Sequence, residues 1–226
     1  MAAAIRGSNT FTVPSGSSTL TVTLPVTTNA GDVIIVATSA QGTTTFSMSG
    51  GSSTTWTTPG SNVGVAPTCW TMLGYNAPAG VTSATLSYTT GGAGSGACAV
   101  ISGLTTTNPV VQSGNGSSTA STTANAALAS AIKSTNLLFY ATSHFGATSE
   151  SGVWSADSLS FTQLQFSNNN SRPVAIDYKN PAGSGALGNS VTVTYNNSNA
   201  GGLTVLELNA PVTGIPGSLA SLGVGT

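Results

Sequence analysis

The sequence predicts an all-β protein made of two tandem, internally repeated antiparallel β-sandwich units, of jelly-roll or immunoglobulin-like type. Apolar and hydroxyl residues alternate over short segments, and turns rich in Gly, Ser and Asn separate these segments. No stretch combines a helical apolar period with capping residues. The segments of the first half recur in the same order in the second half, which is typical of a repeated structural unit.

The first half begins with two alternating segments, Thr10–Val13 and Thr19–Leu24, which flank the turn residues Pro14–Ser17. The next segment, Val33–Ala37, is apolar at every position and follows Gly31-Asp32. Such a short β-branched run between turn residues predicts a strand that is buried on both faces. Further strands of this half are expected at residues 45–48, 55–57, 68–75, 84–88 and 97–101.

The second half contains a near copy of the buried run at Leu137–Ala141, and residues 177–183 match residues 74–80. Residues 191–195 likewise match 84–88. We therefore predict units at residues 1–107 and 108–210, joined near Thr105–Pro109. Residues 124–133 are the best helix candidate, but they align with a strand of the first half, so we expect strand or irregular structure there. Residues 211–226 are predicted to be a C-terminal tail that orders against a neighbouring subunit.

The composition argues against several classes of partner. Only 4 % of the 226 residues are charged, against roughly 25 % in ordinary soluble domains. Four basic residues and a net charge of −1 do not favour binding to nucleic acid or to an anionic membrane. A neutral surface rich in hydroxyl groups instead favours close packing into an assembly, so a homo-oligomer is expected.

The N-terminal residues lack the apolar core of a secretory signal peptide, and no run approaches the ~20 apolar residues of a membrane span. We expect either a cytosolic protein or one that leaves the cell by another route, such as release inside a virus particle.

The inventory of reactive residues argues against catalysis. His144 is the only histidine, so metal sites that need several histidines are not expected, and no phosphate loop, dinucleotide fingerprint or calcium loop occurs. A serine triad would need His144 near Asp157 or Asp177, and the sequence has no nucleophile elbow. Glu150 and Asp157 could form a glycosidase pair, as any two acids in a β protein could. We predict no enzyme and no cofactor, with His144 in a loop.

A few residues of the second half have no counterpart in the first half and are candidate ligand contacts. Trp154 ends the loop-like segment Ser151–Trp154. An exposed Trp here would stack on a sugar ring or lie in a subunit contact, and the sequence leaves both alternatives open. This candidate site also includes His144, Phe145 and Asn169. Asn169 belongs to the loop Asn168–Asn170.

The two cysteines, Cys69 and Cys98, both fall on expected strands of the first half. Adjacent strands could bring their Cα atoms within the ~7 Å that a disulfide needs. We predict free thiols, because the second unit contains no cysteine and is expected to fold the same way.

One set of motifs resembles a known group of proteins. It comprises Leu24-Pro25, Ala30–Val36, a Gly/Ser loop with Trp56, Tyr75–Gly80 and Val100–Gly103. This pattern is similar to the Thr/Ser/Gly-rich β-sandwich modules of tailed-bacteriophage virion proteins, of the minor tail, fibre and capsid-decoration types. The second half departs from it, with Thr135-Asn136 in place of Gly31-Asp32.

The resemblance implies a non-enzymatic structural protein that packs on other virion proteins and is assembled in the host bacterial cytoplasm. It implies no catalytic residues. The alternative hypothesis is a carbohydrate-binding adhesin or receptor-binding module that recognises a glycan on the host cell surface.

Overall fold

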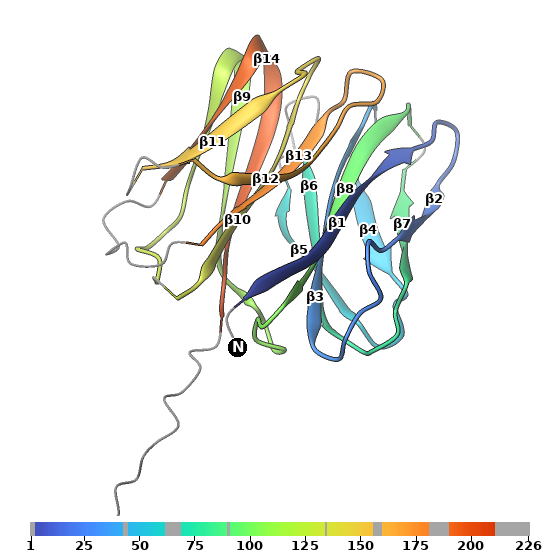
Figure 1. Ribbon diagram of the computed structural model, residues 1–226. Coiled ribbons are helices and arrows are strands. Elements are labelled where there is room, and N and C mark those ends of the chain that lie inside the picture. Colours follow the sequence, from blue (N-terminus) through green and yellow to red (C-terminus); the bar gives the residue numbers. More distant parts are fainter. Residues whose placement is uncertain are drawn as a thin grey trace, which may run out of the picture.

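The computed structural model describes residues 3–42, 45–61, 69–89, 91–133, 135–155, 160–180 and 190–210 (Figure 1). All regular structure in these ranges is β-strand, which confirms the all-β prediction, and none of it forms a helix that could cross a membrane. The strands are β1 (Ala4–Val13), β2 (Thr19–Thr23), β3 (Asp32–Ala40), β4 (Phe46–Ser49), β5 (Thr55–Ser61), β6 (Trp70–Ala77), β7 (Ser83–Tyr88), β8 (Gly94–Ser102), β9 (Val110–Ala127), β10 (Leu137–His144), β11 (Glu150–Trp154), β12 (Thr162–Ser167), β13 (Val174–Lys179) and β14 (Ser190–Leu208).

The strands form three antiparallel sheets. Sheet A has the order β1-β8-β3-β6-β5, and sheet B has the order β2-β7-β4. Sheet C has the order β11-β14-β10-β13-β12, with β9 also paired to β14. Sheets A and B contain only strands of the first half, and sheet C contains only strands of the second half. The expected junction near residues 105–109 therefore lies between the last strand of sheet A and the first strand of sheet C.

Sheet C folds over itself because β9 and β14 are long and change register partway along. The first part of β14 pairs with β11 and with the end of β9, whereas its last part pairs with β10 and with the start of β9. Two register shifts separate these parts, between Thr194 and Gly201, and a third lies between Glu207 and Leu208. One core cluster fills the fold, with Val191 and Trp154 on one side and Leu138 and Val205 on the other. The second half is thus a sandwich in its own right.

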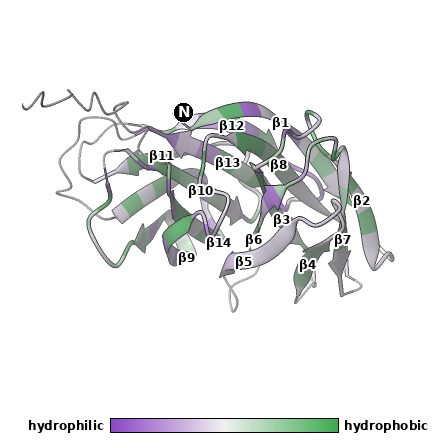
Figure 2. Cartoon of the chain, turned by 90° about the horizontal axis from the view of Figure 1, so that it is seen from below, coloured by the Kyte–Doolittle hydropathy of each residue, from purple (hydrophilic) through white to green (hydrophobic). Residues whose placement is uncertain are grey.

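The strand pairings of the two halves correspond one to one. In the first half β8 pairs with β1 and β3, and β7 pairs with β2 and β4. In the second half, the last part of β14 takes the place of β8, and the first part of β14 takes the place of β7. The start of β9 takes the place of β1, and the end of β9 takes the place of β2. The outermost layers show the expected alternation of apolar and polar residues along each strand (Figure 2). The same order of pairing supports the predicted duplication, which itself stays an inference from the sequence.

The two sandwiches pack back to back through sheets A and C. The core between these sheets draws on both halves, with Val33, Ile35 and Ile101 facing Phe139 and Ile176. A separate core lies between sheets A and B. The strand β3 consequently has both faces buried, because Ile35 points toward sheet C while Ile34 and Val36 point toward sheet B. This arrangement confirms that the run Val33–Ala37 is buried on both faces.

Close backbone approach between the halves depends on a glycine. A Cβ atom at Gly60 of β5 would lie 2.2 Å from Thr204 Cγ2 on β14 and 2.9 Å from Asn115 Oδ1 on β9. On the opposite edge, Gln165 Nε2 of β12 donates hydrogen bonds to the Ser8 carbonyl (3.2 Å) and hydroxyl (3.1 Å) of β1. Both edges of the contact between sheets A and C are therefore fitted closely.

Because the halves share a core, we expect them to unfold together. Trp154 is the only tryptophan of the second half, so a protein carrying Trp56→Phe and Trp70→Phe reports on that half alone by fluorescence. In this background Ile35→Ala, a change in the first half, should lower the free energy of unfolding reported by Trp154 by about 2–5 kcal/mol. Ile35→Val should give a smaller loss in the same direction. If neither substitution shifted the unfolding transition followed by Trp154 fluorescence, this would contradict a shared core.

Candidate functional site

A group of buried polar side chains lies inside the second sandwich. The Tyr140 hydroxyl of β10 lies between the carboxyl groups of Glu150 on β11 (2.6 Å) and Asp177 on β13. Gln163 of β12 donates from Nε2 to the other oxygen of Glu150 at 2.7 Å. Both carboxyl groups therefore face the same phenolic oxygen. One phenolic proton cannot serve both carboxyl groups, so the arrangement is satisfied when one of them is protonated.

The electrostatics of this cluster favour such a bound proton. Burial, and then the negative charge of Glu150, raises the pKa of Asp177 from 3.8 to about 8. Burial also raises the pKa of Glu150. The Tyr140 pKa is raised far above its usual range by burial and by both neighbouring carboxyl groups, so the phenol stays a hydrogen-bond donor. The cluster therefore holds one negative charge and one shared proton near neutral pH.

The packing around Tyr140 fixes this arrangement. A Cβ atom at Gly152 would lie 2.3 Å from Tyr140 Cε1, so the ring rests directly on the backbone of β11. Phe161 contacts the same ring edge to face, with 4.8 Å between centroids. In the first half, the corresponding part of the core, between sheets A and B, is formed by apolar residues such as Val36 and Met72. The polar cluster is thus specific to the second half.

Replacement of Asp177 should change the dependence of stability on pH. Because the folded pKa of Asp177 is raised, its contribution to stability is complete below about pH 4 and is lost as the pH rises toward about 8. The loss can reach about 1.4 kcal/mol per pH unit. Asp177→Asn mimics the protonated form, so its thermal unfolding midpoint should exceed that of the natural protein at pH 9 and approach it at pH 5.

Tyr140→Phe provides a comparison, since it removes the phenol donor from both carboxyl groups and leaves Glu150 only the hydrogen bond from Gln163. It should destabilise the protein by about 1–3 kcal/mol across the whole pH range. If the thermal unfolding midpoints of the natural protein and of Asp177→Asn changed with pH in the same way, this would contradict the shared proton.

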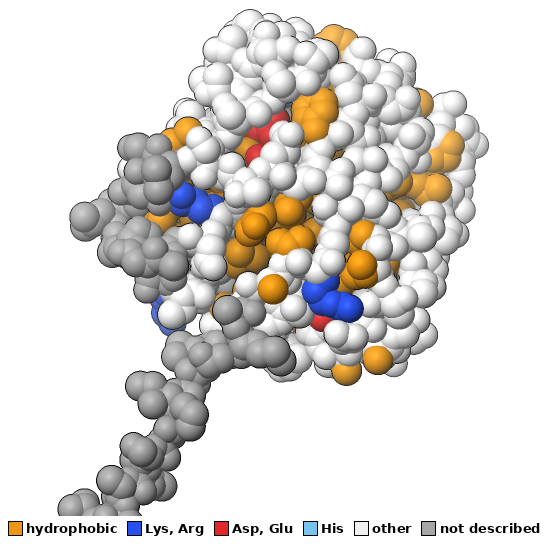
Figure 3. Space-filling view, in the orientation of Figure 1, with side chains coloured by type: hydrophobic (Ala, Val, Ile, Leu, Met, Phe, Trp, Pro, Cys, Tyr) orange, Lys and Arg blue, Asp and Glu red, His pale blue; other side chains and the backbone are white. Residues whose placement is uncertain are grey.

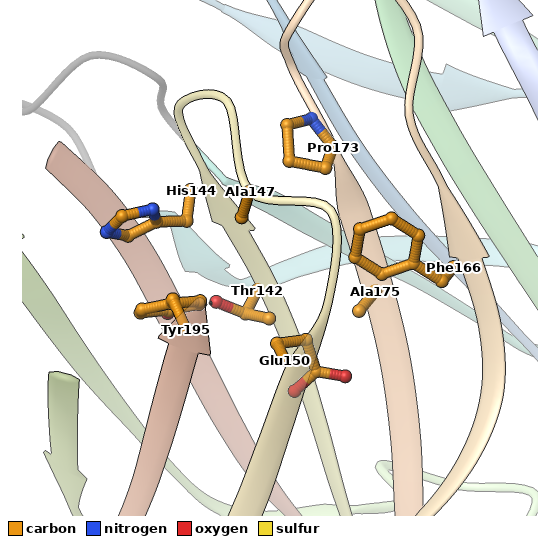
Figure 4. A pocket seen from close by; sticks show the side chains of 8 residues that line it. All are labelled: Thr142, His144, Ala147, Glu150, Phe166, Pro173, Ala175 and Tyr195. Carbon is orange, nitrogen blue, oxygen red and sulfur yellow. Dashed lines mark hydrogen bonds between the residues drawn. The ribbon is translucent and has the colours of Figure 1, made fainter. Parts of the chain in front are cut away.

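A narrow pocket lies beside this cluster. Figure 4 shows His144 and Tyr195 on one wall, and Phe166 and Pro173 on the other. The His144 ring stacks on Tyr195, with 3.9 Å between centroids, and burial lowers the pKa of His144, which favours the neutral imidazole. The space between the walls is too narrow to hold a water molecule. Side chains of the second sandwich therefore fill this space.

The structure corrects the roles expected for Trp154 and His144. Trp154 lies in β11 with its side chain fully buried in the core of the second sandwich, so it is not an exposed platform for a sugar. His144 is the last residue of β10 and not a loop residue, and only 1 % of its surface is exposed. Both residues contribute to the core because β11 and β10 pair with β14, a contact that local sequence does not reveal.

Asn169 and Phe145 have different surroundings. The Asn169 backbone N–H donates to Ser95 Oγ (2.6 Å), and its side-chain amide donates to the Gly94 carbonyl (3.1 Å), so Asn169 ties the second half to β8. Phe145 follows β10 and is 39 % exposed. The guanidinium of Arg172 lies 4.3 Å from the centroid of its ring. Of the four predicted contact residues, Phe145 is exposed, Asn169 is partly buried, and Trp154 and His144 are buried.

The described carboxyl groups form internal contacts. Asp32 pairs with Arg6 and accepts a hydrogen bond from the Asn29 backbone. Glu207 accepts hydrogen bonds from Gln112, the Lys133 backbone and Asn136. Across the described ranges, no three His, Cys, Asp or Glu side chains gather to hold a metal ion.

The carboxyl partner expected for Glu150 in a glycosidase pair, Asp157, lies outside the described residues. Its observed neighbour is Asp177, because both carboxyl groups accept a hydrogen bond from the Tyr140 hydroxyl. Two wider hollows, of about 400 and 450 Å³, are lined by residues 51–52 with 78–83 and by residues 104–107, and neither contains an ionisable side chain.

Sequence reasoning missed the Tyr140 cluster. The signal was present in the repeat, because Asp177 aligns with Gly74 and Tyr140 aligns with Val36. Polar residues at two positions that are apolar or small in the first half indicate a buried polar contact.

Both cysteines are free, as predicted, and the structure shows that both are fully buried. Burial raises the pKa of each thiol to about 12. We expect neither Cys69 nor Cys98 to react with a thiol reagent in the folded protein, and both to react in denaturant. The unfolding temperature should not change when dithiothreitol is added. Modification of the folded protein at neutral pH would contradict this burial.

Comparison with family models, with curated proteins and with solved structures found no match to this chain.

Proposed function

We propose that this protein is a non-enzymatic structural component of a bacteriophage virion, of the capsid-decoration, head-fibre or minor tail type, which packs on other virion proteins. The observation that carries the proposal is the nearly uncharged surface. Asp32, Asp177 and Glu207 are each no more than 2 % exposed, so the few acids are directed inward. In the view of Figure 3, the described surface is mostly uncharged, with small blue and red areas.

The outer face of sheet B supports packing against a neutral neighbour. It presents hydroxyl side chains from all three strands, and the paired positions match across the sheet, as in the row Thr21, Thr85 and Ser49. Such a face repels neighbours weakly and offers both donors and acceptors of hydrogen bonds.

Mass spectrometry of purified phage particles tests this proposal. The ratio of this chain to the major capsid protein should stay constant through successive density gradients, because a structural component sediments with the particle. A host protein of similar abundance serves as the control, and its ratio should fall at each step. Loss of this chain together with the host protein would overturn the proposal.

A further inference from the structure

The exposed end of the second sandwich carries an aromatic ring beside an arginine. Phe145 is one of two large apolar side chains in the described residues that are prominently exposed, and the other, Val111, lies on β9. The Arg172 guanidinium stacks on the Phe145 ring at 4.3 Å from its centroid. Phe145 begins the loop after β10, and Arg172 lies in the loop before β13, separated from that strand by Pro173.

Hydrogen bonds hold both loops in place. The side-chain amides of Asn197 and Asn199 donate to the Phe145 carbonyl, at 3.0 and 3.2 Å. The Gly146 N–H donates to the Ser171 carbonyl at 3.1 Å, which links the two loops directly. The Arg172 N–H donates to the carbonyl of Asn169, which is itself bonded to β8. The pair is therefore preorganised, which lowers the entropic cost of binding a ligand.

Arg172 has no carboxylate partner among the described residues. The ion pair found there joins Arg6 to Asp32, at a different place on the surface. Arg172 makes one long side-chain hydrogen bond, from Nη1 to the Ser171 carbonyl at 3.4 Å, and its buried Nε has no partner. A guanidinium carries five N–H donors and binds carboxylates well. Partial burial lowers the pKa of Arg172, so a nearby anion would stabilise its charge.

The fold does not require this pair. At the corresponding positions the first half has Gln41 and Cys69, and Cys69 is a fully buried core residue. An exposed aromatic ring and a cation without a counter-ion are thus features of the second half alone. The carboxyl groups of Glu150 and Asp177 are occupied by Tyr140 and do not compete for the arginine.

We propose that Phe145 and Arg172 form a binding site for an acidic sugar unit of a polysaccharide. The sugar carboxylate binds the guanidinium of Arg172, and an apolar face of the sugar ring contacts the uncovered part of Phe145. One isolated cation fits one carboxylate, whereas nucleic acid requires several cations along a backbone. The neutral surroundings, which include Asn197 and Asn199, suit sugar hydroxyl groups. This site goes beyond the proposed role in assembly and does not depend on it.

Calorimetric titration of the full chain with a galacturonic acid oligosaccharide tests the site, with a galactose oligosaccharide of the same length as the neutral comparison. We expect saturable binding of the acidic oligosaccharide and much weaker binding of the neutral one. Arg172→Gln and Phe145→Ala should each weaken binding roughly tenfold or more. Added salt should weaken binding to the natural protein more than binding to Arg172→Gln.

Two matched variants control for nonspecific effects. Lys133→Gln removes another exposed cation, and Val111→Ala removes the other prominently exposed apolar side chain, so neither should change affinity. Circular dichroism checks that all variants fold. Phe145→Leu keeps an apolar side chain, so its affinity for the acidic oligosaccharide should lie between those of Phe145→Ala and the natural protein. The proposal is overturned if the acidic oligosaccharide does not bind, or if Arg172→Gln binds it as tightly as the natural protein.

Discussion

The core shared by sheets A and C is the contact on which the rest of the structure depends. It buries the second face of each sheet, so strands such as β3 and β10 are enclosed on both sides and read as continuous apolar runs. The contact is reciprocal at its edges. β1 lies against β12, while β9, the counterpart of β1, lies against β5, the counterpart of β12. Such reciprocity is the geometry of a two-fold symmetric interface within one chain.

This enclosed architecture limits where charge can be placed. A carboxyl group inside it needs hydrogen-bond donors, and the structure supplies them in separate groups. Glu207 is bound by amide donors at one end of sheet C, and Glu150 and Asp177 share protons with Tyr140 farther along it. Because most described acids are used internally, the surface is left to hydroxyl and amide groups. An uncharged exterior and an interior in which each described carboxyl group is hydrogen-bonded are thus two results of the same packing.

Binding residues on such a surface must come from positions that the fold does not use. His144 and Trp154 fill the second core, and Asn169 links the halves, so each is explained by packing. Phe145 and Arg172 lie in loops, where side chains can vary without disturbing the sheets. A particle protein built in this way would keep its assembly surfaces separate from its ligand-binding loops.

The sequence alone determined the strand content and the two-sided burial of Val33–Ala37, because these follow from local periodicity and composition. Tertiary structure decided which polar residues meet. Ser151–Trp154 reads as a loop, yet pairing with β14 makes it a strand and buries the indole. Likewise, Tyr140, Glu150 and Asp177 come from three strands and meet only when sheet C folds over itself. Burial of a side chain depends on what packs against it, and that partner is far away in the sequence.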